Sequence, residues 1–153
     1  MSLRIGSGYD SHRFEQGRRL VLGGVEIEHD RGLAGHSDAD VLIHALIDAI
    51  LGAVGRGDIG THFPPSEERW RDSESGDLLA AALAIAGGRL VNADLTLIAE
   101  EPRLGPHRER IEARLTALAG APVSVKATTN EGMGWIGRGE GVAAIAVALV
   151  DSD

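Results

Sequence analysis

Apolar residues recur with two different periods along the chain, and each period predicts one kind of element. Polar and apolar residues alternate from Leu90 to Ala99, which is typical of a strand, and Pro102 ends it. Between Asp38 and Val54 the apolar residues recur three or four positions apart, which predicts a helix ending at Gly55. The other predicted elements are a strand beginning at Leu3–Ile5, a strand with a bulge or tight turn over Val21–Glu28, helices over Asp77–Ala86 and Pro106–Leu118, and strands over Val123–Thr128 and Val142–Val150.

These elements predict an α/β (α+β) fold in which helices cover one face of a mixed sheet. At 153 residues the chain is long enough to bury one core, so we expect a single domain over residues 1–153. The last strand, Val142–Val150, is apolar on both faces, which predicts an oligomer that covers its second face. The segment Gly57–Gly76 contains two prolines and many charges, and we expect it to be an irregular, mobile flap.

The charge balance and the cysteine count narrow the possible partners. Fifteen Lys and Arg stand against 23 Asp and Glu, a formal net charge of −8, so we do not expect the clustered positive surface that nucleic acids need. The absence of cysteine excludes disulfides and thiolate metal sites and fits a reducing compartment. No basic, long apolar leader opens the chain and no apolar stretch is long enough for a bilayer, so we expect a cytoplasmic protein with no membrane partner.

Three residues form a candidate metal site. Asp10 and His12 lie two positions apart after the predicted strand start, so their side chains would point to the same face. His44 lies on the predicted helix Asp38–Val54 and could supply a third ligand. Two histidines and a carboxylate suit zinc, with one position left open for a substrate oxygen. Each residue alone has an ordinary explanation, since an Asp-x-His pair is common and a lone histidine in an apolar helix is more often a core residue.

A second group of residues has the chemistry of a phosphate site. His36 precedes Ser37, and Ser37 with Asp40 has the spacing of a capping box at the start of the helix. Free backbone N–H groups beside an imidazole would favour a phosphate. A capping box needs no function, however, and Gly57–Gly60 is also explained as an ordinary turn.

A third group follows the predicted strand Val123–Thr128. Thr129 and Glu131 precede a stretch rich in glycine, Gly132–Gly141. Taken alone, Glu131 is a solvated loop charge and the glycines are a flexible connection. Together, hydroxyl groups, a carboxylate able to hold a hard cation and glycines that admit phosphate oxygens are what a diphosphate site requires.

Several motifs, taken together, resemble one family. They are Gly6–His12, Leu22–Val25, Ala34–Asp40 with His44, Gly57–Gly60, Phe63–Pro65, Pro102–His107, Lys126–Thr129 and Gly137–Gly141. In this order and at these spacings the chain resembles the 2-C-methyl-D-erythritol 2,4-cyclodiphosphate synthase family over nearly its whole length. Several independent motifs at compatible spacing are far more specific than any one glycine pattern.

The resemblance implies a phosphorus–oxygen lyase of the non-mevalonate isoprenoid pathway. Its substrate would be 4-diphosphocytidyl-2-C-methyl-D-erythritol 2-phosphate. The 2-phosphate would attack the β-phosphorus, release CMP and close the cyclic diphosphate. Because the attacking group belongs to the substrate, the protein would only fold the substrate back on itself and neutralise its charge.

The resemblance also implies roles for individual residues. Asp10, His12 and His44 would hold zinc, and Glu131 would hold magnesium or manganese. His36 and Thr129 would stabilise the transition state. The residues implied in substrate binding are Ser37 at the attacking phosphate, Asp58, Ile59 and Gly60 at sugar hydroxyls, Phe63, Pro64, Pro65, Ser66 and Glu67 in the flap, Ala99, Glu100, Glu101, Pro102, Arg103, Leu104 and Gly105 at cytosine, and Thr128, Asn130, Trp135 and Arg138 at the phosphate and cytidine end.

The family is a homotrimer with active sites between subunits. By resemblance, Ala99–Gly105 and Thr128–Glu131 would face the zinc ligands of another chain. A cavity on the threefold axis that can hold an isoprenoid diphosphate is also implied, with Arg138 and Glu140 in the motif near it.

The sequence departs from the family pattern in two places. After Thr129, Asn130 replaces a usual threonine and Gly132–Met133 replace the common Lys-Leu. In the flap, Pro65 replaces a frequent Asp, and Arg71–Ser75 replaces the usual Lys-Gly-Ala-Asp-Ser. The Asn130 amide can still donate or accept a hydrogen bond, so we expect this change to tune the site and not to abolish it. Every metal and phosphate position is retained.

Two other functions are compatible with these residues. One is a zinc phosphohydrolase, with water in the open zinc position and Asp58 or Asp40 as general base. The other is a non-catalytic trimer with structural zinc that binds isoprenoid diphosphates. Glu131 and Ala99–Gly105 argue against the second, because a structural zinc requires neither.

Overall fold

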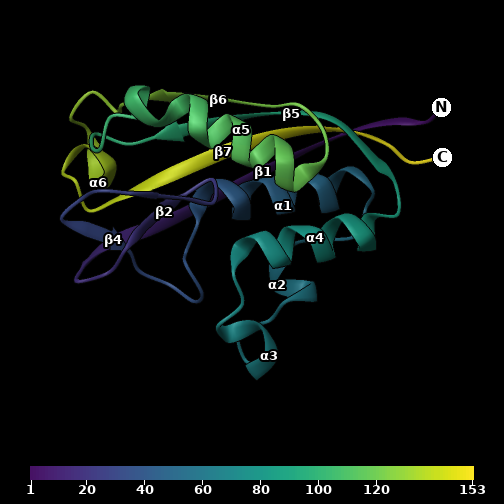
Figure 1. Ribbon diagram of the computed structural model, residues 1–153, viewed down its shortest axis with the longest axis horizontal. Helices are drawn as coiled ribbons and strands as arrows, with labels where there is room; N and C mark the ends of the chain where they lie inside the picture. Colours follow the sequence, from purple (N-terminus) through teal and green to yellow (C-terminus); the bar gives the residue numbers. More distant parts are fainter.

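The sheet is built from five strands, and the computed structural model describes all residues from 1 to 153 (Figure 1). The strands are β1 (Leu3–Gln16), β4 (Arg31–Leu33), β5 (Arg89–Ile98), β6 (Val123–Thr128) and β7 (Gly141–Asp151). Their order is β4-β1-β7-β5-β6, and β5 and β6 are parallel whereas the other pairs are antiparallel. The sheet is therefore mixed, as the sequence predicts.

Three helices lie on the same side of this sheet, two packed against it and the third packed on those two, which confirms the expected layering (Figure 1). They are α1 (Val41–Ala53), α4 (Ser75–Ala86) and α5 (Arg108–Ala119). α1 packs on β1 and β7 with one side and on α4 with another, and α5 packs on β6. Because it lies between two layers, α1 is apolar on nearly every side. Its residues that are not fully buried are His44, Asp48 and Gly52.

Two glycines let α1 lie directly on β1. A Cβ atom on Gly6 or Gly8 would come within 2.0 Å of a backbone carbonyl oxygen of α1, that of Ala49 or Ala45. Real Cβ atoms do not approach this closely, so only glycine fits at these two positions of the strand. The helix that carries His44 is therefore held against the strand that carries Asp10 and His12.

A buried carboxylate joins α1 to a small hairpin. Strands β2 (Leu20–Leu22) and β3 (Val25–Ile27) pair around the turn Gly23-Gly24, where both glycines have positive φ. The carboxylate of Asp40 accepts hydrogen bonds from the N–H groups of Gly23 at 2.9 Å, Gly24 at 2.7 Å and Ile43 at 3.2 Å. Burial raises the pKa of Asp40 to about 6, although these backbone donors favour its charged form. The predicted bulge or turn in Val21–Glu28 is therefore a hairpin turn.

The expected capping box at Ser37 is wrong. The helix begins at Val41 with Asp40 as its N-cap, whereas Ser37 has φ 61° and its hydroxyl donates to the carbonyl of Ser73. Asp40 takes the capping position because the same carboxylate also satisfies the hairpin N–H groups. Residues 38 and 39, which we assigned to the helix, belong to the preceding loop.

The segment predicted to be an irregular flap contains regular structure. It includes α2 (Ile59–His62), α3 (Glu68–Arg71) and the first two residues of α4. Asp58 caps α2, since its carboxylate accepts from the N–H of Thr61 at 2.9 Å and from its hydroxyl at 2.8 Å. Three other short elements were not predicted: β4, a 3₁₀ turn η1 (Gly105–His107) before α5, and α6 (Gly134–Gly137).

The face of the sheet opposite the helices is open in the single chain. Its exposed apolar side chains come from β1 and β7 and are Leu3, Ile5, Tyr9, Ile145 and Val147. The other face of β7 is buried against α1, as Ala144, Ala146 and Ala148 are. β7 was predicted to be buried on both faces. Within the single chain, one of its faces is buried and the other is exposed. None of the helices combines the length and the hydropathy needed to cross a lipid bilayer.

Candidate metal centre and substrate cavity

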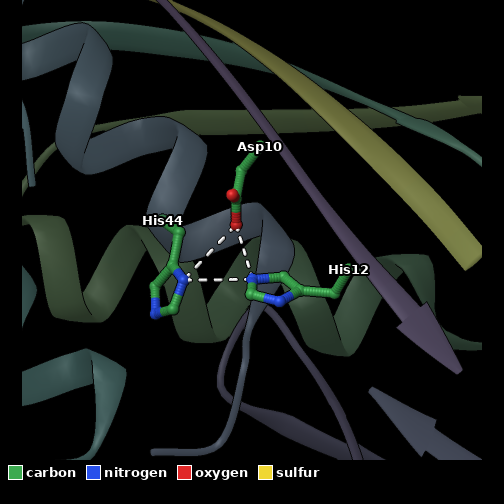
Figure 2. A group of neighbouring side chains, drawn as sticks. All are labelled: Asp10, His12 and His44. Carbon is green, nitrogen blue, oxygen red and sulfur yellow. Dashed lines mark hydrogen bonds and ion pairs between the residues drawn. The ribbon is translucent and has the colours of Figure 1, made fainter. Parts of the chain in front are cut away.

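Asp10, His12 and His44 converge as the sequence predicts, two from β1 and one from α1 (Figure 2). Oδ2 of Asp10 lies 2.8 Å from Nε2 of His12 and 3.3 Å from Nδ1 of His44, and the two nitrogens are 3.3 Å apart. A tetrahedral zinc with bonds of about 2.0–2.1 Å holds its ligand atoms about 3.3 Å apart. The three atoms are therefore spaced as ligands of one ion.

The direction of the Asp10 carboxylate also fits a metal ion. Its Oδ2 is buried and, despite these short separations, has no hydrogen bond of acceptable geometry. A buried oxygen without a donor is costly unless something else satisfies it. An ion at the point that all three atoms face would satisfy it.

The ionised carboxylate of Asp10 suits a cation as well. Burial opposes the charge on Asp10, but the two imidazoles outweigh it and lower the pKa of this carboxyl to about 2. For His12, burial disfavours the charged ring, while the Asp10 carboxylate and the Ala34 carbonyl raise its pKa. Nδ1 of His12 lies 2.9 Å from the Ala34 carbonyl oxygen. With a proton on Nδ1, His12 presents the lone pair of Nε2 to the shared point.

The metal cluster opens into a cavity of about 210 Å³. Its walls bring together His12 and His44 with six residues predicted for a phosphate and a flap, namely His36, Ser37, Ile59, Gly60, Phe63 and Pro65, and with Gly35, Trp70 and Leu78. Trp70 was not predicted. It packs edge to face on Phe63, with ring centroids 4.9 Å apart. The only feature of the sequence that could have indicated its place in the cavity is that it is an aromatic residue in a polar segment.

Other predicted flap residues lie off this wall. Asp58 is exposed and its carboxylate is engaged in capping α2. Pro64, Ser66 and Glu67 are not in the cavity lining, and Glu67 is ion-paired with Arg69 at 2.9 Å. Asp48, one turn beyond His44 on α1, accepts the N–H of Ile59 at 2.8 Å and so fastens the start of α2 to α1.

A second, separate cavity of about 500 Å³ gathers most residues predicted to bind the cytidine end. Its lining is Leu97, Ala99, Glu100, Pro102, Arg103, Leu104, Ala127, Thr128 and Thr129, without Glu101 or Gly105. The adjoining loop is held by two contacts: the N–H of Gly132 donates to Glu100 at 2.8 Å, and the Asn130 amide donates to the Met133 carbonyl at 2.8 Å. Glu131, at the tip, is exposed with φ 55°.

The single chain does not bring these two halves together. The two cavities share no lining residue, and Glu131 is not part of the Asp10 cluster. Trp135 instead lines a small cavity with Ser11, His12, Arg13 and Glu140, and Arg138 is ion-paired with Glu140 at 2.7 Å. One base proposed for a phosphohydrolase is excluded, because the buried carboxylate of Asp40 accepts its hydrogen bonds from the backbone N–H groups of Gly23, Gly24 and Ile43, none of which lines the cavity.

The fold and the site define an α+β protein with a candidate His-His-carboxylate metal centre between a mixed sheet and a flap. The chain belongs to the YgbB family, whose sequence model matches residues 3–151. It is 57% identical over 152 residues to a protein of Symbiobacterium thermophilum named 2-C-methyl-D-erythritol 2,4-cyclodiphosphate synthase, covering 95% of this chain and 97% of that one.

Two further comparisons agree with this assignment. A solved structure of 2C-methyl-D-erythritol-2,4-cyclodiphosphate synthase in a form bound to CDP matches with a TM-score of 0.89 and 41% identity, over 97% of this chain and all of that one. A bifunctional IspD/IspF enzyme of Erythrobacter litoralis is 52% identical over 98% of this chain. The chain spans 40% of the length of that bifunctional relative.

Proposed function

We propose that this chain converts 4-diphosphocytidyl-2-C-methyl-D-erythritol 2-phosphate into 2-C-methyl-D-erythritol 2,4-cyclodiphosphate and CMP. The observation that carries the proposal is the cavity in which His36 and Ser37 line the same wall as the metal ligands His12 and His44. Membership of the YgbB family and 57% identity to a protein named for this activity support it.

In this reaction one bond forms and one breaks. An oxygen of the substrate's 2-phosphate bonds to the β-phosphorus, and the bond from that phosphorus to the oxygen bridging to the α-phosphorus breaks, so that CMP leaves. The protein supplies no nucleophile. Its contribution is to hold the two phosphates together and to stabilise the charge that gathers on them.

Asp10, His12 and His44 would hold zinc, which when bound supplies a Lewis acid at a phosphate oxygen. His36 would stabilise the transition state, and Ser37 would contact the attacking phosphate by turning its hydroxyl away from the Ser73 carbonyl, to which it donates in the single chain. Phe63, Trp70 and Leu78 give the cavity an apolar part of its lining, so the closed flap would exclude water that could intercept the β-phosphorus.

We propose that the second half of the site comes from another copy of the chain in a homotrimer. Glu131 would hold magnesium or manganese, Thr129 would stabilise the transition state, and Ala99–Gly105 would bind cytosine. Two features support this arrangement: the metal cavity and the cytidine cavity are separate in one chain, and an apolar sheet face is left uncovered. An isoprenoid diphosphate on the trimer axis, near Arg138, remains a separate proposal.

The test is to incubate the purified protein with zinc, magnesium and the proposed substrate and to follow the products by phosphorus NMR. We expect two coupled resonances of a cyclic diphosphate and one equivalent of CMP. CMP with only open-chain phosphate products would replace the proposal by a phosphohydrolase. No turnover, together with binding of an isoprenoid diphosphate, would replace it by a binding protein.

A further inference from the structure

Behind the metal centre, His44 is connected to a buried serine and a carboxylate. Nε2 of His44 lies 3.0 Å from Oγ of Ser75, which is fully buried. That hydroxyl donates a hydrogen bond to Oδ1 of Asp38, and the N–H of Ser75 donates to Oδ2 of the same carboxylate at 3.0 Å. Ser75 is the first residue of α4, 31 positions from His44 in the sequence. The function proposed above assigns no role to Ser75 or Asp38.

The hydrogen bonds that connect His44, Ser75 and Asp38 can be donated in one direction only. An ionised carboxylate only accepts hydrogen bonds, so the single hydroxyl proton of Ser75 goes to Asp38. The hydroxyl oxygen then has lone pairs left, and it accepts from Nε2 of His44. His44 therefore carries its proton on Nε2 and presents the lone pair of Nδ1 to Asp10 and His12. This is the tautomer that a metal ligand through Nδ1 requires.

We propose that Ser75 and Asp38 are positioning residues that set the tautomer and the ring orientation of His44 for metal binding. The proposal rests on the metal role proposed for Asp10, His12 and His44. Ser75 would then accept a hydrogen bond from the ring nitrogen of His44 that does not face the metal, as the Ala34 carbonyl does for His12. A carboxylate that reaches a metal-bound histidine through a hydroxyl also makes the imidazole a stronger ligand.

The hydroxyl of Ser75 can be removed without removing the backbone hydrogen bond between Ser75 and Asp38, which caps α4. Glu74, the N-cap residue of α4, makes no capping hydrogen bond with its side chain. Oδ2 of Asp38 takes that place by accepting the backbone N–H of Ser75. The substitution Ser75→Ala keeps this backbone contact and removes only the two hydrogen bonds of the hydroxyl, those to Asp38 Oδ1 and to His44. Ser73, two residues earlier, is a matched control because its hydroxyl donates to the Arg69 carbonyl at 2.8 Å.

The first measurement is zinc affinity of the apoprotein, by competition with a chromophoric chelator. We expect Ser75→Ala to weaken zinc binding by about 10–100-fold, and Ser73→Ala to change it less than about twofold. Asp38→Asn, which keeps the volume of the side chain but removes its charge, should give an intermediate loss. Zinc affinity of Ser75→Ala equal to that of the wild type would overturn the proposal.

The second measurement needs no metal. Nitrogen-15 NMR of the imidazoles in the apoprotein distinguishes the two neutral tautomers. We expect His44 to be protonated on Nε2 in the wild type and to become a mixture of tautomers in Ser75→Ala and in Asp38→Asn. An unchanged tautomer in both variants would contradict the proposal. A wild-type protein that bound no zinc would instead refute the proposed metal site, while the tautomer would still report on Ser75.

Discussion

Gly8 of β1 and Ala45 of α1 are in backbone contact: a Cβ atom on Gly8 would lie 2.0 Å from the carbonyl oxygen of Ala45. This contact sits between the strand that carries Asp10 and His12 and the helix that carries His44. Any side chain at Gly8 would push the helix away from the strand and separate the three ligand atoms.

We therefore expect Gly8→Ala to destabilise the fold by at least about 3 kcal/mol, at the upper end of overpacking costs, since the clashing atoms are backbone. Any folded fraction should bind zinc more weakly. Chemical denaturation and a zinc titration would measure both effects. The control is Gly52→Ala on the exposed side of α1, where a Cβ atom meets only ordinary contact at 3.8 Å. It should stabilise the protein by about 0.5–1 kcal/mol.

The two metal positions should respond differently to substitution. His44→Ala removes a zinc ligand, so we expect zinc affinity and turnover each to fall by more than about 100-fold, as loss of a direct ligand should exceed loss of an outer partner. Glu131→Gln should keep stoichiometric zinc and lose turnover by about 10²–10³-fold, because it removes charge stabilisation at the phosphates. Metal analysis of the dialysed proteins and product NMR would decide; stoichiometric zinc in His44→Ala would refute the ligand assignment.

Asp40 should stabilise the fold through its three backbone hydrogen bonds. In Asp40→Asn an NH2 group, which cannot accept, would replace an oxygen that accepts a backbone N–H, so we expect a loss of about 2 kcal/mol or more at about pH 3, where the carboxyl is largely protonated in both states of the wild type. Urea unfolding would measure it. A variant as stable as the wild type at this pH would show that the contacts carry no net energy.

The same residue predicts a pH dependence. Burial raises the pKa of Asp40 to about 6, so the folded state binds its proton more tightly than the unfolded state does. Between about pH 4 and pH 6 its contribution to stability should fall as pH rises, and the gap to Asp40→Asn should narrow. Asp58 is the control, because hydrogen bonds from Thr61 lower its pKa instead of raising it. The difference in stability between the wild type and Asp58→Asn should not narrow between about pH 4 and pH 6. A gap that widened with pH would contradict the burial argument.

The open sheet face should be needed for assembly and for activity. Ile145 lies opposite Tyr9 in the pairing of β7 with β1, and both are exposed in the single chain. We expect Ile145→Asp to give a monomer by light scattering, with zinc bound and turnover lost, because a charge cannot be buried there unpaired. Ala117→Asp, on the exposed side of α5, is the control and should leave assembly unchanged. An active trimer of Ile145→Asp would exclude this face as the interface.

Much of the element pattern follows from the sequence because it is local. The predicted strand Val123–Thr128 matches β6 at both ends, and the ends of helices α1, α4 and α5 were predicted to within three residues. β4 was missed because three residues carry no periodicity. It forms only because Phe14 and its neighbours at the end of β1 pair with it.

In the candidate site, too, some features follow from the sequence and others only from the fold. The residue types of Asp10, His12 and His44, and the family motifs around them, were determined by the sequence alone. Which residue caps α1 was not, because Ser37 and Asp40 both carry a capping side chain and only the N–H groups of a distant hairpin choose between them. The contact of Ser75 with His44 joins residues 31 positions apart, and no spacing rule reaches that far. Element type and ligand type depend on residues that are neighbours in the sequence, so the sequence determines them. Contacts between distant residues, such as Ser75 with His44, form only when α1, the sheet and α4 pack together.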